Sequence, residues 1–241
     1  MGTKRGASMS ALISDHVVWL LPVVLSTTAG AVDVIGFLTL GGLLSAHITG
    51  NLVIVVAHYV TGGFGEIGPL LSVPVFVTVL LIAAIFANQE TRRARRTLLV
   101  LQAVLLTAFL GLGVAFGPFP NPDAGIGVLA GMLGVAAMAI QNALIRLALP
   151  GSPSTAVMTT NTTQLAVDLA TVVRGTDGQD KLARSRRRIG QIFPSIAGFV
   201  IGCASAAFLE VGYGLWALML PVTLATIAIA LGECWRDQPT T

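Results

Sequence analysis

The chain has 241 residues, of which 54% are hydrophobic and 10% are charged, and its formal net charge is +3. Soluble domains carry about 25% charged residues, so this composition excludes an ordinary soluble protein and indicates an integral membrane protein. The two cysteines, Cys203 and Cys234, do not make a disulfide framework, and no Cys/His spacing fits a zinc site, so we expect no metal and no cofactor.

Eight apolar segments follow one another along the chain. The first lies behind Lys4 and Arg5 and continues well past the length of a signal-peptide core, which predicts a retained helix. The second and sixth contain only about 12 to 14 residues, and at about 1.5 Å per residue they are too short to cross about 30 Å of hydrocarbon comfortably. The segments are residues 17–40, 50–61, 69–88, 97–116, 125–146, 160–173, 190–208 and 213–231.

Nearly the same polar motif precedes both short segments. His47–Asn51 reads His-Ile-Thr-Gly-Asn, and Val157–Asn161 reads Val-Met-Thr-Thr-Asn. Allowing a two-residue insertion in the loop at Pro150–Pro153 brings Asp33 opposite Gln141 in the apolar segments that precede the motifs. These matches occur in the same order, and together they predict an internally duplicated protein.

The basic residues distinguish two topologies. If all eight segments crossed the membrane, the fourteen Lys and Arg residues would split five to nine between its two sides, whereas all fourteen face the cytoplasm if both short segments enter and leave on the same side. Six crossings then divide into three per half, and an odd number inverts the second half relative to the first. We therefore expect an all-α membrane protein with six transmembrane helices, two short re-entrant helices and an inverted internal repeat.

This topology divides the chain into membrane repeats and cytoplasmic ends. The basic run Lys181–Arg188 is expected to orient the protein and to meet lipid headgroups of the bilayer. Neither basic cluster contains an aromatic residue, so we expect no nucleic-acid site. The divisions are a cytoplasmic N-terminal tail at residues 1–16, a first membrane repeat at 17–117, a second at 118–232 that includes a basic cytoplasmic loop at 174–189, and a cytoplasmic C-terminal tail at 233–241.

The two motifs lie where short helices are expected to begin. A helix start presents unpaired N–H groups and a partial positive charge, and Thr49, Asn51, Thr159, Thr160 and Asn161 are suited to cap those groups or to share them with a solute. Two such ends meeting near the bilayer centre would favour an anion or a polar neutral molecule. Capping alone, without any solute, is the alternative interpretation, and both stay open.

Asp33 lies inside the first apolar segment, and an ionisable residue at that depth is a functional hypothesis by default. It is expected to carry a proton or bind a coupling ion, and the alternative is a hydrogen-bonded Asp that locks two helices together. His47 is the first residue of the first motif and can relay protons. Gln141 and Asn142 occupy the corresponding place in the second half and cannot titrate, so proton coupling would be carried by one half only.

Two more polar residues in the short segments are expected to have structural roles. His58 is interpreted as a hydrogen-bonded packing residue, with proton relay as the alternative. Asp168 lies near the cytoplasmic end of the sixth segment and is interpreted as part of a solvated face.

Four stretches carry a family resemblance. Gly30–Phe37, Thr49–Asn51, Ala139–Ala143 and Val157–Asn161 resemble the YoaK family of bacterial multi-pass inner-membrane proteins, which is classed as a domain of unknown function. The resemblance covers nearly the whole chain and implies a location in the bacterial cytoplasmic membrane, but no substrate. Related sequences commonly carry Thr-Gly-Asn in both halves, whereas Gly is replaced here by Thr160 in the second.

We therefore predict a transporter or channel for a small polar or anionic solute, embedded in the lipid bilayer. The alternative is a non-transporting scaffold or sensor whose polar residues are structural, and a homo-oligomer stays open in either case. No strand-turn-helix serine motif and no phosphate-binding glycine loop is present, so an enzyme is not expected. The predicted site residues are Asp33, His47, Thr49, Asn51, Gln141, Asn142, Thr159 and Asn161.

Overall fold

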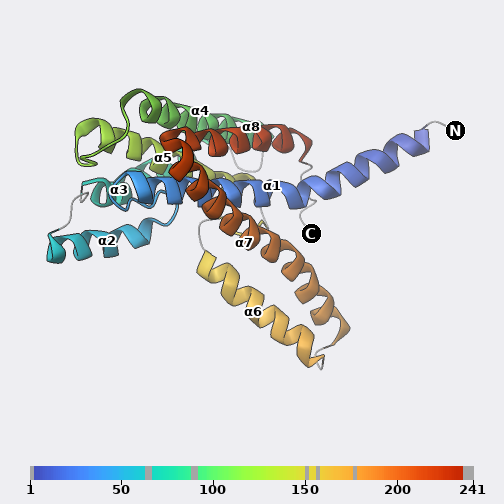
Figure 1. Ribbon diagram of the computed structural model, residues 1–241. Coiled ribbons are helices and arrows are strands. Elements are labelled where there is room, and N and C mark those ends of the chain that lie inside the picture. The colour runs from blue at the N-terminus through green and yellow to red at the C-terminus, as the bar shows by residue number, and fades with distance from the viewer. Residues whose placement is uncertain are drawn as a thin grey trace.

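The computed structural model describes residues 3–62, 67–87, 92–149, 152–155, 158–175 and 178–235, with side chains from Trp19 onward. All regular structure in these residues is helical, in eight α-helices and one short 3-10 helix (Figure 1). The elements are α1 (Thr3–Thr39), α2 (Ile48–Thr61), α3 (Ile67–Phe86), α4 (Arg92–Phe116), α5 (Gly125–Ala148), α6 (Met158–Arg174), α7 (Gln179–Tyr213), η1 (Gly214–Leu218) and α8 (Met219–Cys234).

Among the described residues, five helical stretches are long and apolar enough to cross a membrane. This finding agrees with the expectation of an all-α membrane protein. The last stretch is continuous through α7, η1 and α8 and is long enough to contain two crossings. The stretches are Trp19–Thr39, Ile67–Phe86, Arg92–Phe116, Gly125–Ala148 and Gln179–Cys234.

The basic segment predicted as a loop at 174–189 is largely helical. α7 begins at Gln179, so residues 179–189 form its first turns, and only a short connection separates it from α6. The run from Lys181 to Ile189 contains no Gly or Pro, and Lys, Arg, Leu and Ala all have high helix propensity, so nothing stops the helix before the apolar part of α7. In the same way α1 already begins at Thr3, within the predicted N-terminal tail.

The helices pack in two groups that share the centre of the bundle. α1 packs against α7 and α8, while α5 packs against α3 and α4, and α4 also contacts α8. Of the short helices, α2 packs on α3 and α6 packs on α7. In Figure 1 α6 and the first half of α7 project from the bundle side by side.

Glycine permits the close approach of α1 and α7. A Cβ atom on Gly30 would lie 2.3 Å from the carbonyl oxygen of Phe199, and one on Gly202 would lie 2.1 Å from the carbonyl oxygen of Thr27. Neither position can hold a larger residue unless the backbones separate. Small residues at such crossings are typical of membrane helices, where close van der Waals contact supplies much of the association energy.

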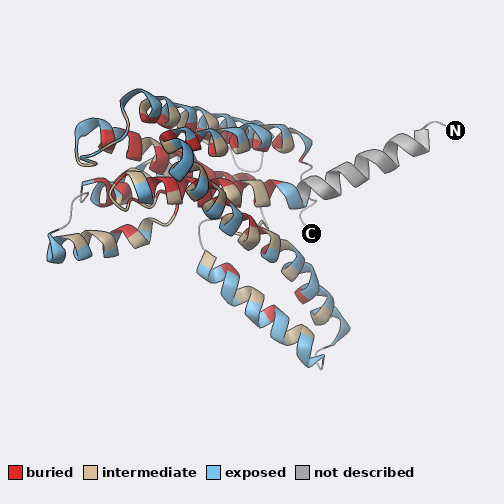
Figure 2. Ribbon diagram, in the orientation of Figure 1, coloured by how far each residue is buried: buried red, intermediate tan, exposed pale blue. Residues whose placement is uncertain are grey.

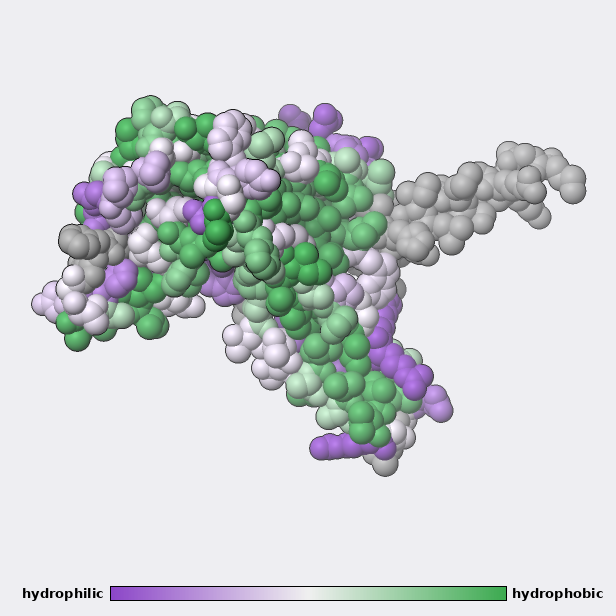
Figure 3. All heavy atoms as spheres, in the orientation of Figure 1, coloured by the Kyte–Doolittle hydropathy of each residue, from purple (hydrophilic) through white to green (hydrophobic). Residues whose placement is uncertain are grey.

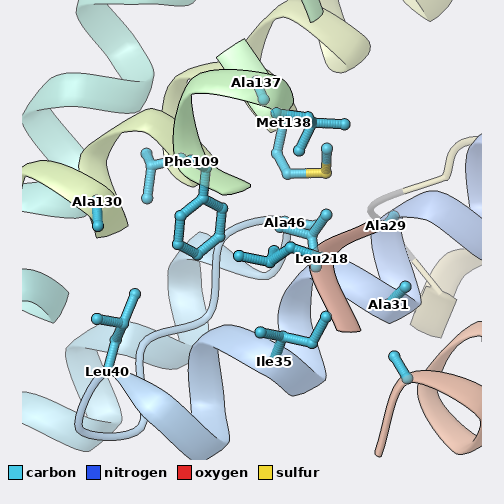
Figure 4. Close-up of a cluster of buried hydrophobic side chains, with 14 of the residues drawn as sticks. Ala29, Ala31, Ile35, Leu40, Ala46, Phe109, Ala130, Ala137, Met138 and Leu218 are labelled. Atoms are coloured by element: carbon cyan, nitrogen blue, oxygen red, sulfur yellow. The ribbon is translucent and has the colours of Figure 1, made fainter. Parts of the chain in front are cut away.

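Two hydrophobic clusters fill the interior. One includes Ile35 and Leu40 of α1 and its following turn, together with Phe109 and Leu218, and Figure 4 shows the Phe109 ring directed into it. The other lies around the earlier part of α1, from Leu21, and also contains Leu99, Leu144 and Trp235. In Figure 2 the buried residues accordingly follow the inward faces of α1, α4 and α5.

The outer surface is apolar as well. Within the most apolar window of α3 only 17% of the residues are buried, and Val77, Leu81, Ile85 and Phe86 are all exposed. Figure 3 shows hydrophobic side chains over much of the visible face, with hydrophilic ones at the tip of the α6–α7 pair and along parts of the edge. A helix that is apolar on all sides yet exposed is suited to lipid rather than to water.

Candidate functional site

Asp33 holds the turn between α1 and α2 against α1. Its Oδ1 accepts a hydrogen bond from the Ala46 N–H at 2.6 Å, and its Oδ2 lies 2.5 Å from His47 Nδ1. Because Asp33 precedes the end of α1 at Thr39 by six residues, the turn folds back along the helix by about 9 Å before α2 begins. The structure thus brings two predicted site residues together, and Asp33 is only 4% exposed.

Gly41 and Gly42 make this reversal possible. Their φ angles are 64° and 84°, a region that side chains strongly disfavour. The N–H of Gly42 bonds the carbonyl of Phe37, which ends the helix as a left-handed cap does. The His47 ring then packs edge-on against the Phe199 ring of α7, with centroids 5.2 Å apart. The Asp33–His47 pair therefore lies at the contact between the turn and α7.

Asn51 is fully buried and uses both ends of its amide. Nδ2 donates to the Leu44 carbonyl and to Ser72 Oγ, each at 2.7 Å, and Oδ1 accepts from the Leu44 N–H at 2.8 Å. The amide ties α2 to the preceding turn and to α3, rather than capping the N–H groups at the start of its own helix. Thr49 is exposed, one residue inside α2, so the two polar residues of this motif do not face a common site.

The second motif repeats one of these contacts. Asn161 Nδ2 donates at 2.6 Å to the carbonyl of Ser154, seven residues earlier, which is the separation of Asn51 from Leu44. Asn161 is 5% exposed, while Thr159 and Thr160 are exposed. Val157, the first residue of the predicted motif, lies outside the described residues.

Gln141 is the centre of a buried amide network. Its Nε2 donates to the Leu25 carbonyl at 3.0 Å and to Thr155 Oγ1 at 2.8 Å, and its Oε1 accepts from Gln102 Nε2 at 2.6 Å. The separation from Gln141 to Thr155 is fourteen residues, the same as from Asp33 to His47. Sequence analysis missed Gln102, although a glutamine within an otherwise apolar helix was a usable signal.

Asn142 does not join this network. Its Nδ2 donates to the Met138 carbonyl one turn earlier in α5, and the residue is half-buried. His58 differs from expectation in another way, since its buried Nδ1 has no hydrogen-bond partner among the described residues. Of the eight predicted residues, the structure brings only Asp33 and His47 into direct contact with each other. Asn51, Gln141 and Asn161 each bond a different set of neighbours, and Thr49, Thr159 and Asn142 take no part in these contacts.

A cleft of about 430 Å³ opens beside Asn161. It lies between the end of α5, the start of α6 and the first half of α7. Most of its polar lining offers hydrogen-bond donors, and two of the lining residues are arginines. The polar residues include Arg146, Thr160, Asn161, Gln164, Arg188 and Gln191.

Asp168 is buried beside this cleft. The interpretation from the sequence, that it belongs to a solvated face, is therefore wrong. Its Oδ1 accepts from Arg188 Nη2 at 2.6 Å and from Ser185 Oγ at 2.9 Å, and its Oδ2 accepts from Gln164 Nε2 at 3.1 Å. Burial opposes ionisation of this carboxyl, but these hydrogen bonds and the charge of Arg188 outweigh it and hold the pKa of Asp168 below its ordinary value. Arg188 therefore belongs to an ion pair between α6 and α7, in addition to any contact with lipid headgroups.

The described residues contain no group of three or more His, Cys, Asp or Glu side chains that could hold a metal ion. Cys203 and Cys234 are both free. The buried polar groups are instead joined by amide, hydroxyl and carboxylate hydrogen bonds.

Long apolar helices, an apolar exterior and buried polar networks define the class as a polytopic helical membrane protein. Within that class, residues 21–231 match the family model described as "Protein of unknown function (DUF1275)", and the chain belongs to this family. The match covers all eight predicted site residues and is consistent with the resemblance noted from the motifs. No curated protein and no solved structure matches the chain.

Proposed function

We propose that this chain is a transporter or channel for a small polar or anionic solute. One observation carries the proposal, namely the cleft that opens at the start of α6 beside the second motif. It contains donor groups from three different helices, and its volume of about 430 Å³ is within the range of small-molecule sites.

The lining chemistry favours an anion or a neutral polar molecule over a bare cation. Arg146 and Arg188 contribute guanidinium groups, which only donate hydrogen bonds. Arg188 is shared with Asp168, whereas Arg146 is exposed and forms no ion pair with any described residue. Thr160 adds a hydroxyl close to the positive end of the α6 dipole. A solute carboxylate or inorganic oxyanion would find a cationic partner and neutral donors in one place.

The lengths of the helices support six crossings with two re-entrant helices. α2 has 14 residues and α6 has 17, which correspond to about 21 Å and about 25 Å, less than the hydrocarbon thickness of about 30 Å. The turn held by Asp33 starts α2 well back along α1. Under this proposal α1, α3, α4, α5, α7 and α8 cross the membrane.

The packing pairs support an inverted internal repeat. The repeat would make α1 the counterpart of α5, α2 of α6, α3 of α7 and α4 of α8. Under this exchange the contacts of α1 with α7 and α8 correspond to the contacts of α5 with α3 and α4, and the contact of α2 with α3 corresponds to that of α6 with α7. Every one of these pairs is present. The hydrogen-bond separations of the two halves agree as well, at seven residues from each motif asparagine. An approximate twofold relation of this kind is typical of transporters with alternating access.

The distribution of arginines supports a common cytoplasmic face. Arg92 and Arg96 pair with Glu233 at the end of α8, in the region of the cluster that contains Trp235. Ile145 belongs to the same cluster and lines the cleft with Arg146 and Arg188. These basic groups therefore gather at one end of the bundle. We propose that this end faces the cytoplasm and that the bilayer is the bacterial inner membrane.

A non-transporting scaffold is the second candidate, and a specific observation favours it. Asp33, Asn51 and Gln141 are almost fully buried and bonded to main-chain groups of the connecting segments or of α1. Such contacts stabilise the fold without any solute. The two candidates differ in what they require of Arg146, which is exposed and lines the cleft.

Replacement of Arg146 therefore tests the proposal. The purified chain, R146Q and the control variant T171V, whose side chain lies on α6 away from the cleft, are reconstituted into liposomes with gradients of nitrate, formate or phosphate. A transporter should move at least one of these probes, and R146Q should reduce that flux by about tenfold at an unchanged melting temperature while T171V does not. Absence of flux for every probe in the unsubstituted chain would contradict the proposal and leave the scaffold. Flux that is equal in R146Q and in the unsubstituted chain would show that the cleft lined by Arg146 is not the solute path.

A further inference from the structure

A second, independent cavity lies on the other side of α5. It is a groove of about 640 Å³ between α3 and α4, with α5 forming its floor. α3 and α4 both pack against α5, and the groove lies between these two helices. Its lining is almost entirely apolar and includes Val79, Ala83, Leu98, Leu105, Ala136 and Ile140.

Among the described residues, Arg93 is the one charged residue that lines this groove, and Thr97 lies one turn further along α4. The other arginines at the start of α4 are bound elsewhere. Arg92 and Arg96 pair with Glu233, and Arg95 is buried and donates to main-chain carbonyls at the end of α8. Arg93 is exposed and pairs with no described side chain, because it faces away from α8 and toward α3.

The groove has the length of one lipid leaflet. From Arg93 to Leu105 the helix rises about 18 Å, and half of the hydrocarbon core measures about 15 Å. The charged residue and the hydroxyl lie at one end of α4, and apolar side chains continue from there toward its middle. This arrangement matches the layout of a phospholipid, with a phosphate at Arg93 and Thr97 and an acyl chain below them.

We infer that this groove binds one anionic phospholipid. The apolar lining accounts for the chain, and the uncommitted guanidinium accounts for the charge of the headgroup, since cationic side chains at the headgroup level attract anionic lipid. Ordinary lipid contact with a convex helix surface would need neither the recess nor the single arginine at its mouth. The site is separate from the cleft beside α6 and does not depend on the transport proposal.

The test uses the delipidated full chain in mild detergent. Native mass spectrometry counts retained molecules of phosphatidylglycerol, with phosphatidylcholine as the zwitterionic comparison that carries no net charge. We expect one phosphatidylglycerol per chain, a preference of about tenfold over phosphatidylcholine, and loss of that preference in R93Q. R174Q is the matched control, because Arg174 is exposed at the end of α6 and lies outside the groove.

A136F separates the groove from simple surface attraction, because it fills the floor and leaves Arg93 in place. It should also abolish retention of phosphatidylglycerol, and if it fails to fold, A87F at the mouth replaces it. Retention in the filled groove would overturn the inference, since the lipid would then be held by charge alone. Unchanged preference in R93Q would overturn it as well.

Discussion

Arg188 on α7 and Asp168 on α6 form an ion pair with 2.6 Å between Nη2 and Oδ1. The carboxylate side chain is 1% exposed and the guanidinium side chain 51%. The pair is therefore buried on the Asp168 side only. The carboxylate depends on the ion pair for its stabilisation more than the guanidinium does, because water reaches only the guanidinium. Since α6 packs mainly on α7, this contact is a principal link between the short helix and the rest of the fold.

Removal of Arg188 is expected to destabilise the protein more than neutralisation of Asp168. R188Q leaves a buried carboxylate without its cation, which costs about 3 to 5 kcal/mol for fully buried pairs and about 2 kcal/mol for a pair that water reaches on one side. D168N keeps neutral hydrogen bonds to Ser185 and Gln164 and should cost about 1 kcal/mol. Thermal unfolding in detergent measures both, with R187Q as an exposed control. A greater loss in D168N would show that the hydrogen bonds matter more than the charge.

The two motif asparagines should differ in stability effect despite their similar sequence context. N51L removes bonds to Leu44 and Ser72 and leaves the half-buried N–H and carbonyl of Leu44 without partners, at about 1 to 3 kcal/mol each. N161L removes the bond to Ser154 and should cost about 1 kcal/mol, because that carbonyl adjoins the cleft. Melting temperatures of the two variants compare them directly. Equal losses would mean that the second motif is packed as tightly as the first.

Asp33 is expected to act as the anchor of the turn before α2. In D33L the Ala46 N–H and the His47 ring both lose their acceptor, whereas D33N retains an oxygen for the N–H. Ser45 is 1% exposed, so a cysteine placed there in a background lacking Cys203 and Cys234 should resist maleimide labelling. The D33L substitution should make it reactive, and D33N should not. Protection in both variants would show that Gly42 and the core hold the turn without the carboxylate.

Close contact between α1 and α7 predicts a position-specific effect of alanine. G202A places a Cβ 2.1 Å from the Thr27 carbonyl oxygen, and the helices must separate, at a cost of about 3 kcal/mol. A Cβ atom on Gly212 of the same helix would meet no neighbouring group within 4 Å, so G212A should be neutral or slightly stabilising. Paired melting curves in detergent make the comparison. A similar loss in both would point to helix propensity rather than to the crossing.

The side of the membrane on which each connection lies is tested by cysteine accessibility in the background that lacks Cys203 and Cys234. Single cysteines at Arg92 and Arg187 should react with a membrane-impermeant maleimide only after the cells are opened, because both positions lie at the basic end of the bundle. A cysteine at Asn121, in the connection between α4 and α5, should react in intact cells. Labelling of Arg92 and Arg187 from opposite sides would exclude the proposed six-crossing topology.

Local pattern was enough to predict the class of the protein and much of its helix order. Uncharged tracts are a property of the chain itself, so the membrane class and the short helix after His47 followed from counting residues along the sequence. Asp33 and His47 could also be singled out in this way, because a polar residue is conspicuous in an apolar segment. The basic segment before Gly190 was expected as a loop and is largely helical, since charge marks where a segment leaves lipid and does not show whether its backbone is helical.

Partners across the fold were decided only by tertiary structure. Nothing within the chain near Gln102 indicates that it donates to Gln141, or that Asp168 is buried by Arg188, because each pair joins two helices whose faces meet only after packing. The sequence by itself determined which segments are apolar and where their polar interruptions fall, through local hydropathy and backbone propensity. Only the packed structure determined which of those interruptions are satisfied in the interior and which line a cleft, because hydrogen bonding and burial depend on neighbours that are distant along the chain.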